Sequence, residues 1–275
     1  MYKCINIIIF YDNEDELTNY IIDAADKGTI NNLEFAVVVN KDSNNIINNL
    51  KNKLTKLVDN KIYIYNFGEN IGYLNALLYV VKKIDINNYK YIILSNTDIY
   101  YITKNFYDYL VKKNYENEIG CIAPSVFSSN TNTYSNPHYK TRIPLSKIQR
   151  TQRILLHPQL ARFYIKLSEL KARNMKKKEL PSEYVYSPHG CFMVFTNSFI
   201  HKIAWDSYGA KMYSEESYVG EMLIQYNYKC FYDSNIKIIH KENTITSSIK
   251  NKKKYQYMSE SLQYIINRFY LYKPQ

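Results

Sequence analysis

A short polar run interrupts an apolar stretch in the first half of the chain. Residues 91–94 read Tyr-Ile-Ile-Leu, as in a buried strand, and Ser-Asn-Thr-Asp follows directly at residues 95–98. The chain becomes apolar again at Ile99, with neither Gly nor Pro to mark an ordinary surface turn. A carboxylate at a strand end can hold a hard divalent cation, and the cation can hold a diphosphate. Asp98 could equally cap a following helix, so it leaves both interpretations open.

Two further groups that could do chemistry lie in the second half. Glu215 and Glu216 are adjacent acids directly before a predicted helix whose apolar side carries Val219 and Met222. Because the dipole of a helix stabilises carboxylates at its N-terminus, capping would explain one of these acids. His240 follows a strand-like stretch at residues 236–239, and a lone histidine at such a place is more often structural than a ligand.

The elements that would position these groups alternate between strand and helix. Strands are predicted at residues 5–10, 33–39, 62–65 and 91–94, with apolar helical faces between them. Such alternation favours a parallel sheet with helices on both faces, in which ligands bind at the carboxyl ends of the strands. Asp12, Asn40 and Asp98 all follow strand ends, so the sequence predicts a site along this edge of the sheet.

Several protein classes lose support from the sequence. The first strand is followed by no Gly-x-Gly-x-x-Gly, and no Gly-Lys-Ser/Thr occurs, which argues against dinucleotide oxidoreductases and P-loop enzymes. No stretch approaches the roughly 20 apolar residues of a membrane span, and no secretory signal precedes the first strand. The 4 cysteines lie far apart in sequence, as expected of reduced, mostly buried thiols in a cytoplasmic protein.

The ordered set of motifs resembles family 2 glycosyltransferases of the GT-A fold, especially those that build bacterial surface polysaccharides such as capsule or lipopolysaccharide. The resemblance spans roughly residues 4–245 and rests on Phe10-Tyr11-Asp12, residues 40–44, Glu69-Asn70-Ile71-Gly72-Tyr73, Ser95-Asn96-Thr97-Asp98, His189-Gly190-Cys191-Phe192-Met193, Glu215-Glu216 and His240. It implies an α/β fold with a mixed, mostly parallel sheet flanked by helices. The implied parts are a nucleotide-sugar half (1–135), a basic helical insertion (136–184), an acceptor-binding and catalytic half (185–245) and a helical tail (246–275).

The same resemblance implies a role for each motif. Asp98 and His240 would hold Mg²⁺ or Mn²⁺, and Glu216, with Glu215 beside it, would supply the catalytic base. His189 and Gly190 would lie in the acceptor loop. The residues implied in donor binding are Tyr11, Asp12, Asn40, Asn70, Gly72, Asn96 and Asp98. Two positions depart from the common family pattern, because Asn40 and Asn96 stand where many relatives have Asp.

The implied activity is inverting transfer of a hexosyl or deoxyhexosyl group from a nucleoside diphosphate sugar to a hydroxyl of a growing surface glycan or lipid-linked oligosaccharide. One alternative is a catalytically inactive GT-A relative that acts in binding or assembly. Another is a nucleotidyltransferase, although residues 10–16 contain neither the Gly-rich loop nor the cation that such enzymes usually carry. No nucleic-acid-binding motif is present, so no nucleic-acid partner is expected.

The basic segment from about residue 140 to 183 is not covered by the resemblance, and its cations between residues 140 and 178 contribute much of the formal net charge of +11. Pro158 suits the first turn of a helix in which Leu160, Phe163, Leu167 and Leu170 fall on one face. The simpler expectation is an amphipathic helix that covers the acceptor cleft. The alternative is a helix on the inner face of the cell membrane, with an anionic membrane surface as partner and a lipid-linked acceptor nearby.

Overall fold

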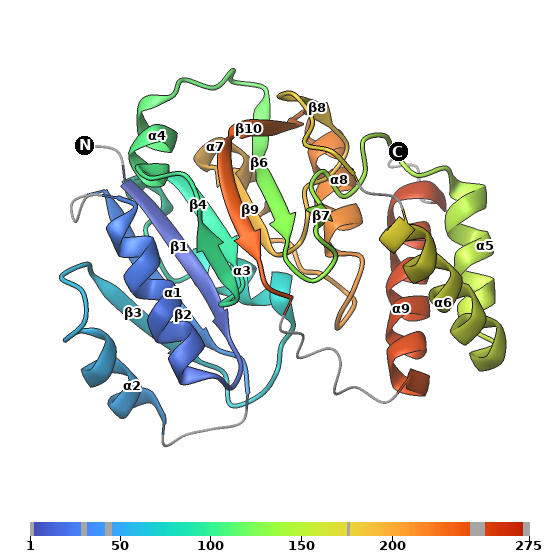
Figure 1. Cartoon of the computed structure of the whole chain (residues 1–275), viewed down its shortest axis with the longest axis horizontal. Coiled ribbons are helices and arrows are strands. Elements are labelled where there is room, and N and C mark those ends of the chain that lie inside the picture. Colours follow the sequence, from blue (N-terminus) through green and yellow to red (C-terminus); the bar gives the residue numbers. More distant parts are fainter. Residues whose placement is uncertain (1–2, 29–31, 42–45, 175–176, 243–250, 272–275) are drawn as a thin grey trace.

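A mixed sheet runs through the molecule with helices on both faces (Figure 1). The computed structural model describes residues 3–28, 32–41, 46–174, 177–242 and 251–271. Residues 42–44 of the second motif, together with the cations Lys176 and Lys250, therefore lie outside the described residues. Within the described part, the strands follow the order β3-β2-β1-β4-β9-β6-β10-β5, with β7 on β6 and β8 on β10.

The strands are β1 (Lys3–Phe10), β2 (Leu33–Val39), β3 (Ile62–Asn66), β4 (Tyr89–Ser95), β5 (Ile99–Tyr101), β6 (Ile119–Ser128), β7 (Thr133–Tyr134), β8 (Glu183–Val185), β9 (Phe192–Thr196) and β10 (Lys229–His240). The helices are α1 (Glu14–Asp26), α2 (Ile46–Leu54), α3 (Tyr73–Val81), α4 (Phe106–Lys112), α5 (Leu145–Leu155), α6 (Pro158–Asn174), α7 (Asn197–Ile203), α8 (Glu215–Gln225) and α9 (Asn251–Ile265). A 3-10 turn (Ile86–Asn88) precedes β4, and a π-helical segment (Ile266–Leu271) follows α9.

The first half of the chain follows the predicted alternation. Strands β1 to β4 are parallel neighbours, and all four predicted strands are present. Asn13 caps α1 as its spacing predicts, because its side-chain oxygen accepts a hydrogen bond from the backbone N–H of Glu16 at 3.1 Å. Two predicted helices end early: α2 stops before Leu57 and α3 stops before Ile84.

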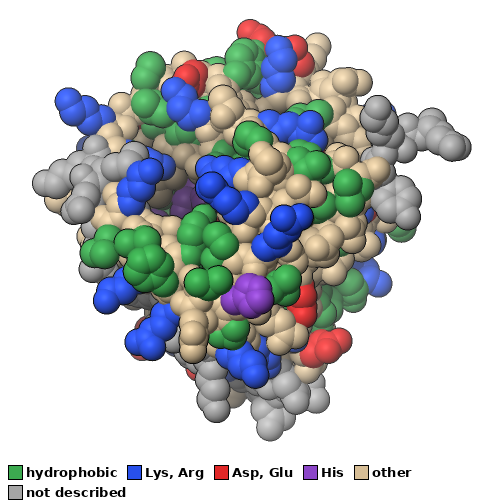
Figure 2. All heavy atoms as spheres, turned by 90° about the vertical axis from the view of Figure 1, so that its right-hand side faces the viewer, with side chains coloured by type: hydrophobic (Ala, Val, Ile, Leu, Met, Phe, Trp, Pro, Cys, Tyr) green, Lys and Arg blue, Asp and Glu red, His purple; other side chains and the backbone are tan. Residues whose placement is uncertain are grey.

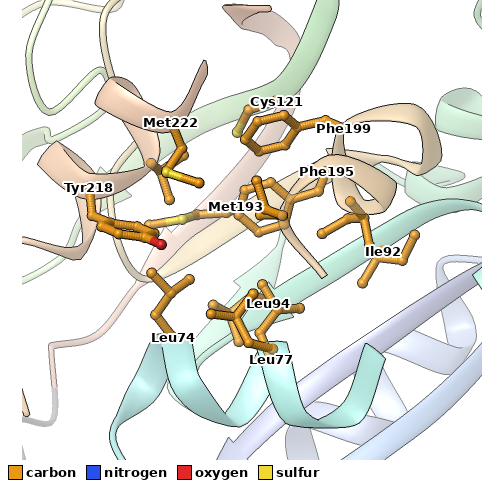
Figure 3. Packing of buried hydrophobic residues seen from close by; sticks show 14 of the residues in the cluster. Leu74, Leu77, Ile92, Leu94, Cys121, Met193, Phe195, Phe199, Tyr218 and Met222 are labelled. Atoms are coloured by element: carbon orange, nitrogen blue, oxygen red, sulfur yellow. The ribbon is translucent and has the colours of Figure 1, made fainter. Parts of the chain in front are cut away.

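Two hydrophobic clusters fill the space on the two faces of the sheet. Side chains of α1 and α4 belong to one cluster, and those of α3, α7 and α8 belong to the other. Figure 3 shows part of the second cluster, where Leu74 and Leu77 of α3 lie below Met193 and Phe195 of β9. The 4 cysteines are free and buried, as predicted. This packing fixes the strand ends that carry the polar motifs.

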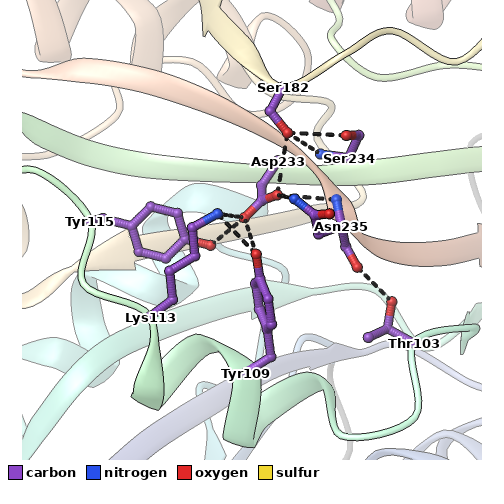
Figure 4. A network of polar contacts seen from close by, with 8 residues as sticks. All are labelled: Thr103, Tyr109, Lys113, Tyr115, Ser182, Asp233, Ser234 and Asn235. Atoms are coloured by element: carbon purple, nitrogen blue, oxygen red, sulfur yellow. Dashed lines mark hydrogen bonds and ion pairs between the residues drawn. The ribbon is translucent and has the colours of Figure 1, made fainter.

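A single long strand, β10, replaces the two strand-like pieces predicted at residues 229–232 and 236–239. Its register against β6 shifts between Asp233 and Lys237. The carboxylate of Asp233 is fully buried at this irregularity, and it binds Lys113 at 2.6 Å and the Tyr115 hydroxyl at 2.7 Å (Figure 4). The apparent break in the sequence pattern is therefore an internal polar anchor that joins β10 to the end of α4.

We expect Asp233→Ala to lower the free energy of unfolding by about 3 kcal/mol, because removing one partner of a buried ion pair leaves the other without compensation. Chemical denaturation measures this change. The matched control is Glu118→Ala, which removes the surface partner of Lys229 and should change stability much less. Equal effects of the two substitutions would contradict the anchoring role of Asp233.

Three helices, α5, α6 and α9, pack together beside the sheet (Figure 1). The expectation that the apolar face of α6 covers the acceptor cleft is wrong. Leu160, Phe163 and Leu167 on this face are 55%, 64% and 49% exposed, so the face points to solvent. None of the described helices is both long and apolar enough to cross a membrane.

Candidate active site

A cleft of about 360 Å³ opens at the carboxyl ends of β1, β2 and β4. Of the site residues predicted from the sequence, all but one line it: Tyr11, Asn40, Asn70, Gly72, Asn96, Asp98, His189, Gly190, Glu215, Glu216 and His240. The exception is Asp12, whose side chain is 74% exposed and paired with Lys41 at 2.5 Å. The lining residues that the sequence reasoning missed are Ile9, Glu16, Tyr73, Thr97, Cys191, Met212 and Tyr213.

The register of the sheet brings three distant motifs together. Strands β4 and β9 run antiparallel with Ser95 opposite Phe192, so the backbone N–H of Asn96 donates to the carbonyl of Cys191 at 3.0 Å. Strands β5 and β10 pair with Ile99 opposite His240. Asp98 therefore lies between the ends of β9 and β10, beside residues that are about 90 to 140 positions away in sequence.

The polar run at residues 95–98 divides into structural and cleft-lining members. Ser95 is fully buried; its hydroxyl donates to Asn6 at 2.9 Å and accepts from the Tyr20 hydroxyl at 2.8 Å. Thr97 donates to the carboxylate of Glu16 in α1. Asn96 and Asp98 line the cleft. The strand end is thus held from both sides while these two side chains are presented to the cleft.

Asp98 and His240 form a buried pair of one acidic and one basic side chain. The Nε2 of His240 lies 3.2 Å from the Oδ1 of Asp98, and both side chains are less than 10% exposed. Burial opposes a charge on His240, but the neighbouring Cys191 and Asp98 outweigh it and raise the pKa of His240 to about 11.

The surroundings of this pair have the chemistry of a cation site. The ligand atoms of His189, Cys191 and His240 lie within 4.8 Å of one another. The buried Nδ1 of His240 forms no hydrogen bond within the described residues. Burial, together with His138 and His240 nearby, lowers the pKa of His189 well below its usual value, so that imidazole is neutral at pH 7. A carboxylate and two imidazoles with available nitrogens are a plausible ligand set for a divalent metal.

Asn40 braces the loop that forms one wall of the cleft. Its side-chain oxygen accepts from the backbone N–H of Ile71 at 2.9 Å, and its Nδ2 donates to the side-chain oxygen of Asn70 at 3.1 Å. A carboxylate at position 40 could not make the second bond, because it has no proton to donate. This explains why Asn suits the position where many relatives of the resembled family have Asp.

Position 72, in the same wall of the cleft, requires glycine. Its φ is +91°, a conformation that side chains rarely adopt, and a Cβ would lie 2.7 Å from the carbonyl oxygen of Lys211. Asn70 accepts from the N–H of Gly72 at 2.9 Å, which links this close approach to the Asn40 brace. Asn40, Asn70 and Gly72 therefore set the shape of the wall.

Glu215 and Glu216 occupy the first turn of α8, and both line the cleft. The two preceding residues, Tyr213 and Ser214, both have positive φ, so a tight left-handed turn aims the helix start into the cleft. Burial, reinforced by the charge of Glu216, raises the pKa of Glu215 to about 8. Glu215 therefore keeps its proton at pH 7.

Gly190 lies directly under the carboxylate of Glu216. A Cβ at this position would be 2.6 Å from the Oε1 and 3.2 Å from the Cδ of Glu216. Gly190 therefore allows the loop before β9 to approach α8 closely, and it fixes where the Glu216 carboxylate sits. The sequence reasoning assigned Gly190 to acceptor binding, and the structure adds this direct contact.

Gly190→Ala should displace the Glu216 carboxylate and reduce turnover at this site by at least about 10-fold, because a shift of about 1 Å in a reacting group can cost 100-fold. The overall fold should persist, since the obstacle is the movable end of a side chain. Turnover and the unfolding temperature are the measurements. Gly68→Ala is the control for a folding effect. Its φ of +71° strains an added side chain, but its Cβ position meets open space, so it should lower the unfolding temperature and leave turnover unchanged. Full activity of Gly190→Ala would contradict the contact's importance.

Glu215→Gln should stabilise the protein at pH 8 by about 4 kcal/mol and have little effect at pH 4. Folding raises the pKa of Glu215 from 4.5 to about 8, so the folded state binds this proton more tightly than the unfolded state does. Stability therefore falls as the pH rises from about 4.5 to 8, and glutamine removes this loss. Chemical denaturation at both pH values measures this difference in the free energy of unfolding. Asp15→Asn is the control, because the Asp15 side chain is exposed. An unchanged pH dependence in Glu215→Gln would contradict it.

Comparison with known proteins gives a structural likeness without a sequence match. No protein-family model and no curated protein matches the sequence. Three solved structures resemble the fold: a mannosyltransferase from Pyrobaculum calidifontis in complex with GDP-Man and Mn²⁺, GalNAc-T7 with UDP, GalNAc and Mn²⁺, and residues 1–349 of S. aureus TarS.

The likeness covers nearly the whole chain at low identity. The TM-scores are 0.56, 0.58 and 0.54, with 8%, 10% and 11% identity over 96%, 92% and 97% of this chain. The chain spans 69%, 47% and 72% of those chains, so it matches about half of GalNAc-T7. The predicted fold class is confirmed: the chain has a GT-A-type fold, in which a mixed sheet is flanked by helices.

Proposed function

We propose that this protein is an inverting glycosyltransferase that moves a hexosyl or deoxyhexosyl group from a nucleoside diphosphate sugar to a hydroxyl of a surface glycan or a lipid-linked oligosaccharide. One observation carries the proposal: a single cleft of a GT-A-type fold is lined both by the Asp98–His240 pair and by Glu215 with Glu216. The structural neighbours in complex with GDP-Man and Mn²⁺ or with UDP and Mn²⁺ support the choice of donor and cation.

The residues present fit a divalent cation. Asp98 and His240 would hold it, with His189 and Cys191 close by. Nitrogen and sulfur donors suit Mn²⁺ better than Mg²⁺, which prefers oxygen ligands and keeps its water. When bound, the cation would act as a Lewis acid toward the leaving diphosphate. We therefore narrow the expected cofactor from Mg²⁺ or Mn²⁺ to Mn²⁺.

The base of the proposed reaction is Glu216. The carboxylate of Glu216 would accept a proton from the acceptor hydroxyl, while Glu215, whose pKa is raised to about 8, keeps its own proton at neutral pH. The oxygen would then attack the anomeric carbon opposite the leaving group, which inverts the configuration. Gly190 lies against the Glu216 carboxylate. His189 directly precedes Gly190 in the loop that we assign to acceptor binding.

The donor would lie along the sheet edge between Tyr11 and Asp98. Tyr11, Asn70 and Asn96 offer polar atoms in the cleft, while Asn40 acts mainly through the loop that it braces. Asp12 turns outward to Lys41, so we assign it no direct contact with the donor. This arrangement gives the nucleotide a wall whose shape is set by backbone and amide contacts.

Thermal unfolding with a panel of nucleotides and nucleotide sugars tests the proposal. We expect one nucleoside diphosphate, and its sugar conjugates, to raise the unfolding temperature with Mn²⁺ and not with EDTA. Binding to the folded state alone contributes about 2.7 kcal/mol at a hundred times the dissociation constant. If no nucleotide shifts the unfolding of the folded protein, the inactive binding or assembly relative becomes the better explanation.

A further inference from the structure

An apolar stripe on α6 and the preceding turn faces solvent. It consists of Leu156, Leu160, Phe163, Leu167 and Leu170, which are 59%, 55%, 64%, 49% and 46% exposed. Their spacing of three and four residues places them on one side of the helix. We call these five residues the apolar ridge. Contiguous exposed apolar surface of this kind marks a contact site more often than chance exposure does.

The ridge is not the side of α6 that stabilises the fold. Ala161 is fully buried, and it belongs to a cluster with Leu155 of α5 and Tyr255 of α9, against which Ile165 packs. Helix α6 therefore has one apolar side turned toward α5 and α9 and a second one turned away from them. Because the inner side already anchors the helix, the ridge has no role in the folded chain that the structure describes.

The charge around the ridge is almost entirely positive. Exposed cations of α5 and α6 flank it: Lys147, Arg150, Arg153, Arg162, Lys166 and Lys171. Between residues 145 and 171 the only acid is Glu169. Figure 2 shows this side of the molecule, where blue side chains surround green ones and red ones are few. Lys252 and Lys253 of the adjoining α9 are also exposed.

These features select one kind of partner. A second copy of this chain would bring like cations together, which opposes a symmetric dimer through this face. A peptide helix would need a groove, whereas the ridge projects from the helix. An anionic lipid surface satisfies both features, because apolar side chains enter the boundary between headgroups and acyl chains while Lys and Arg contact lipid phosphates.

We propose that α6 lies in the surface of an anionic lipid bilayer, with the apolar ridge inserted and the flanking cations against the headgroups. The inference goes beyond the proposed transfer reaction, because it concerns where the protein works. Where it rests on that function, it also favours a lipid-linked acceptor over a free one, since the cleft would be held at the membrane surface.

Vesicle flotation of the full chain tests the proposal. We expect binding to vesicles of phosphatidylcholine with phosphatidylglycerol that is at least tenfold tighter than to phosphatidylcholine alone and that weakens with salt. The triple substitution Leu160→Ser, Phe163→Ser and Leu167→Ser should weaken it at least tenfold at an unchanged unfolding temperature. Trp205→Ser is the matched control, because Trp205 is 83% exposed on another element and should not contribute.

A fluorescence measurement locates the contact. Trp205 is the chain's only tryptophan, so Phe163→Trp in a Trp205→Phe background places a single reporter on the ridge. Its emission should shift to the blue on addition of anionic vesicles and be quenched by brominated lipid. An unshifted emission, or vesicle binding that survives the triple substitution, would overturn the proposal.

Two further measurements separate the membrane proposal from a dimer through the apolar ridge and from the proposed transferase activity. Light scattering that finds a dimer abolished by the ridge substitutions, without vesicle binding, would assign the ridge to a second copy of the chain and overturn the membrane proposal. The nucleotide shift measured on the same variants keeps the two proposals distinct: a normal shift without vesicle binding rejects only the membrane, and vesicle binding without any shift rejects only the transferase.

Discussion

Glu216→Gln should reduce acceptor-dependent release of nucleoside diphosphate by about 10²- to 10⁴-fold, the usual contribution of a general base. The reason lies in the division of roles within the acidic pair. Glu215 keeps its proton at neutral pH because burial raises its pKa to about 8, so we assign the role of base to Glu216, whose carboxylate lies against Gly190. Glutamine has nearly the same shape but cannot take up a proton at this pH.

Binding and folding provide the controls for Glu216→Gln. The variant should keep the nucleotide-induced rise in unfolding temperature, because the Asp98 edge of the cleft is unchanged. Glu215→Gln should lose far less turnover, since the proton that it removes is not the one that moves. If Glu215→Gln loses more turnover than Glu216→Gln, the two roles must be exchanged.

The first half of the fold could be predicted because its information is local. In β1 to β4 and the helices between them, apolar periodicity and the Asn13 cap mark each element, and parallel neighbours follow from the alternation. The second half depends on distant pairing. The register shift in β10 looks like a strand break in the sequence, because the polar Asp233 interrupts the apolar pattern. Asp233 is nevertheless buried, and its partner Lys113 is 120 residues away in sequence, so no local pattern reveals the pairing.

The cleft could be predicted from the order of its motifs, but the division of labour within it could not. Side-chain type suggested that Asn40 touches the donor, whereas its amide is used to hold the loop at Asn70. Cys191 was part of a predicted motif but was given no role, because only the antiparallel register of β4 and β9 shows that it lies beside Asn96. Glu16 of α1 likewise lines the cleft, where it accepts a hydrogen bond from Thr97, 81 residues away in sequence.

The sequence also could not predict which way the apolar face of a helix points. The spacing of Leu160, Phe163 and Leu167 correctly predicted one apolar side of α6, and the sequence then placed that side over the cleft. A second apolar side, built on Ala161 and Ile165, packs against α5 and α9 instead. Periodicity identifies an apolar side, but only the partners of a helix decide which side is buried.

Asp98→Ala should abolish the Mn²⁺-dependent stabilisation by nucleoside diphosphate while leaving the fold intact. Removing an outer-shell partner of a metal ligand already lowers the affinity for the metal by roughly 10- to 100-fold. Removing a ligand itself should therefore lower this affinity at least about 100-fold. Asp98→Asn should behave similarly, because it keeps the side-chain shape and loses the negative charge. Thermal unfolding with Mn²⁺, with EDTA and with the stabilising nucleotide measures both variants.

The matched control for Asp98 is Asp12→Ala, which removes a carboxylate from the same sheet edge. Asp12 follows β1 as Asp98 follows β4, yet its side chain is 74% exposed and bound to Lys41 outside the cleft lining. The control should therefore keep a metal-dependent shift close to that of the unaltered protein. If both substitutions weaken the shift equally, the sheet edge acts through its overall charge; if neither does, the cation is not held at Asp98 and His240.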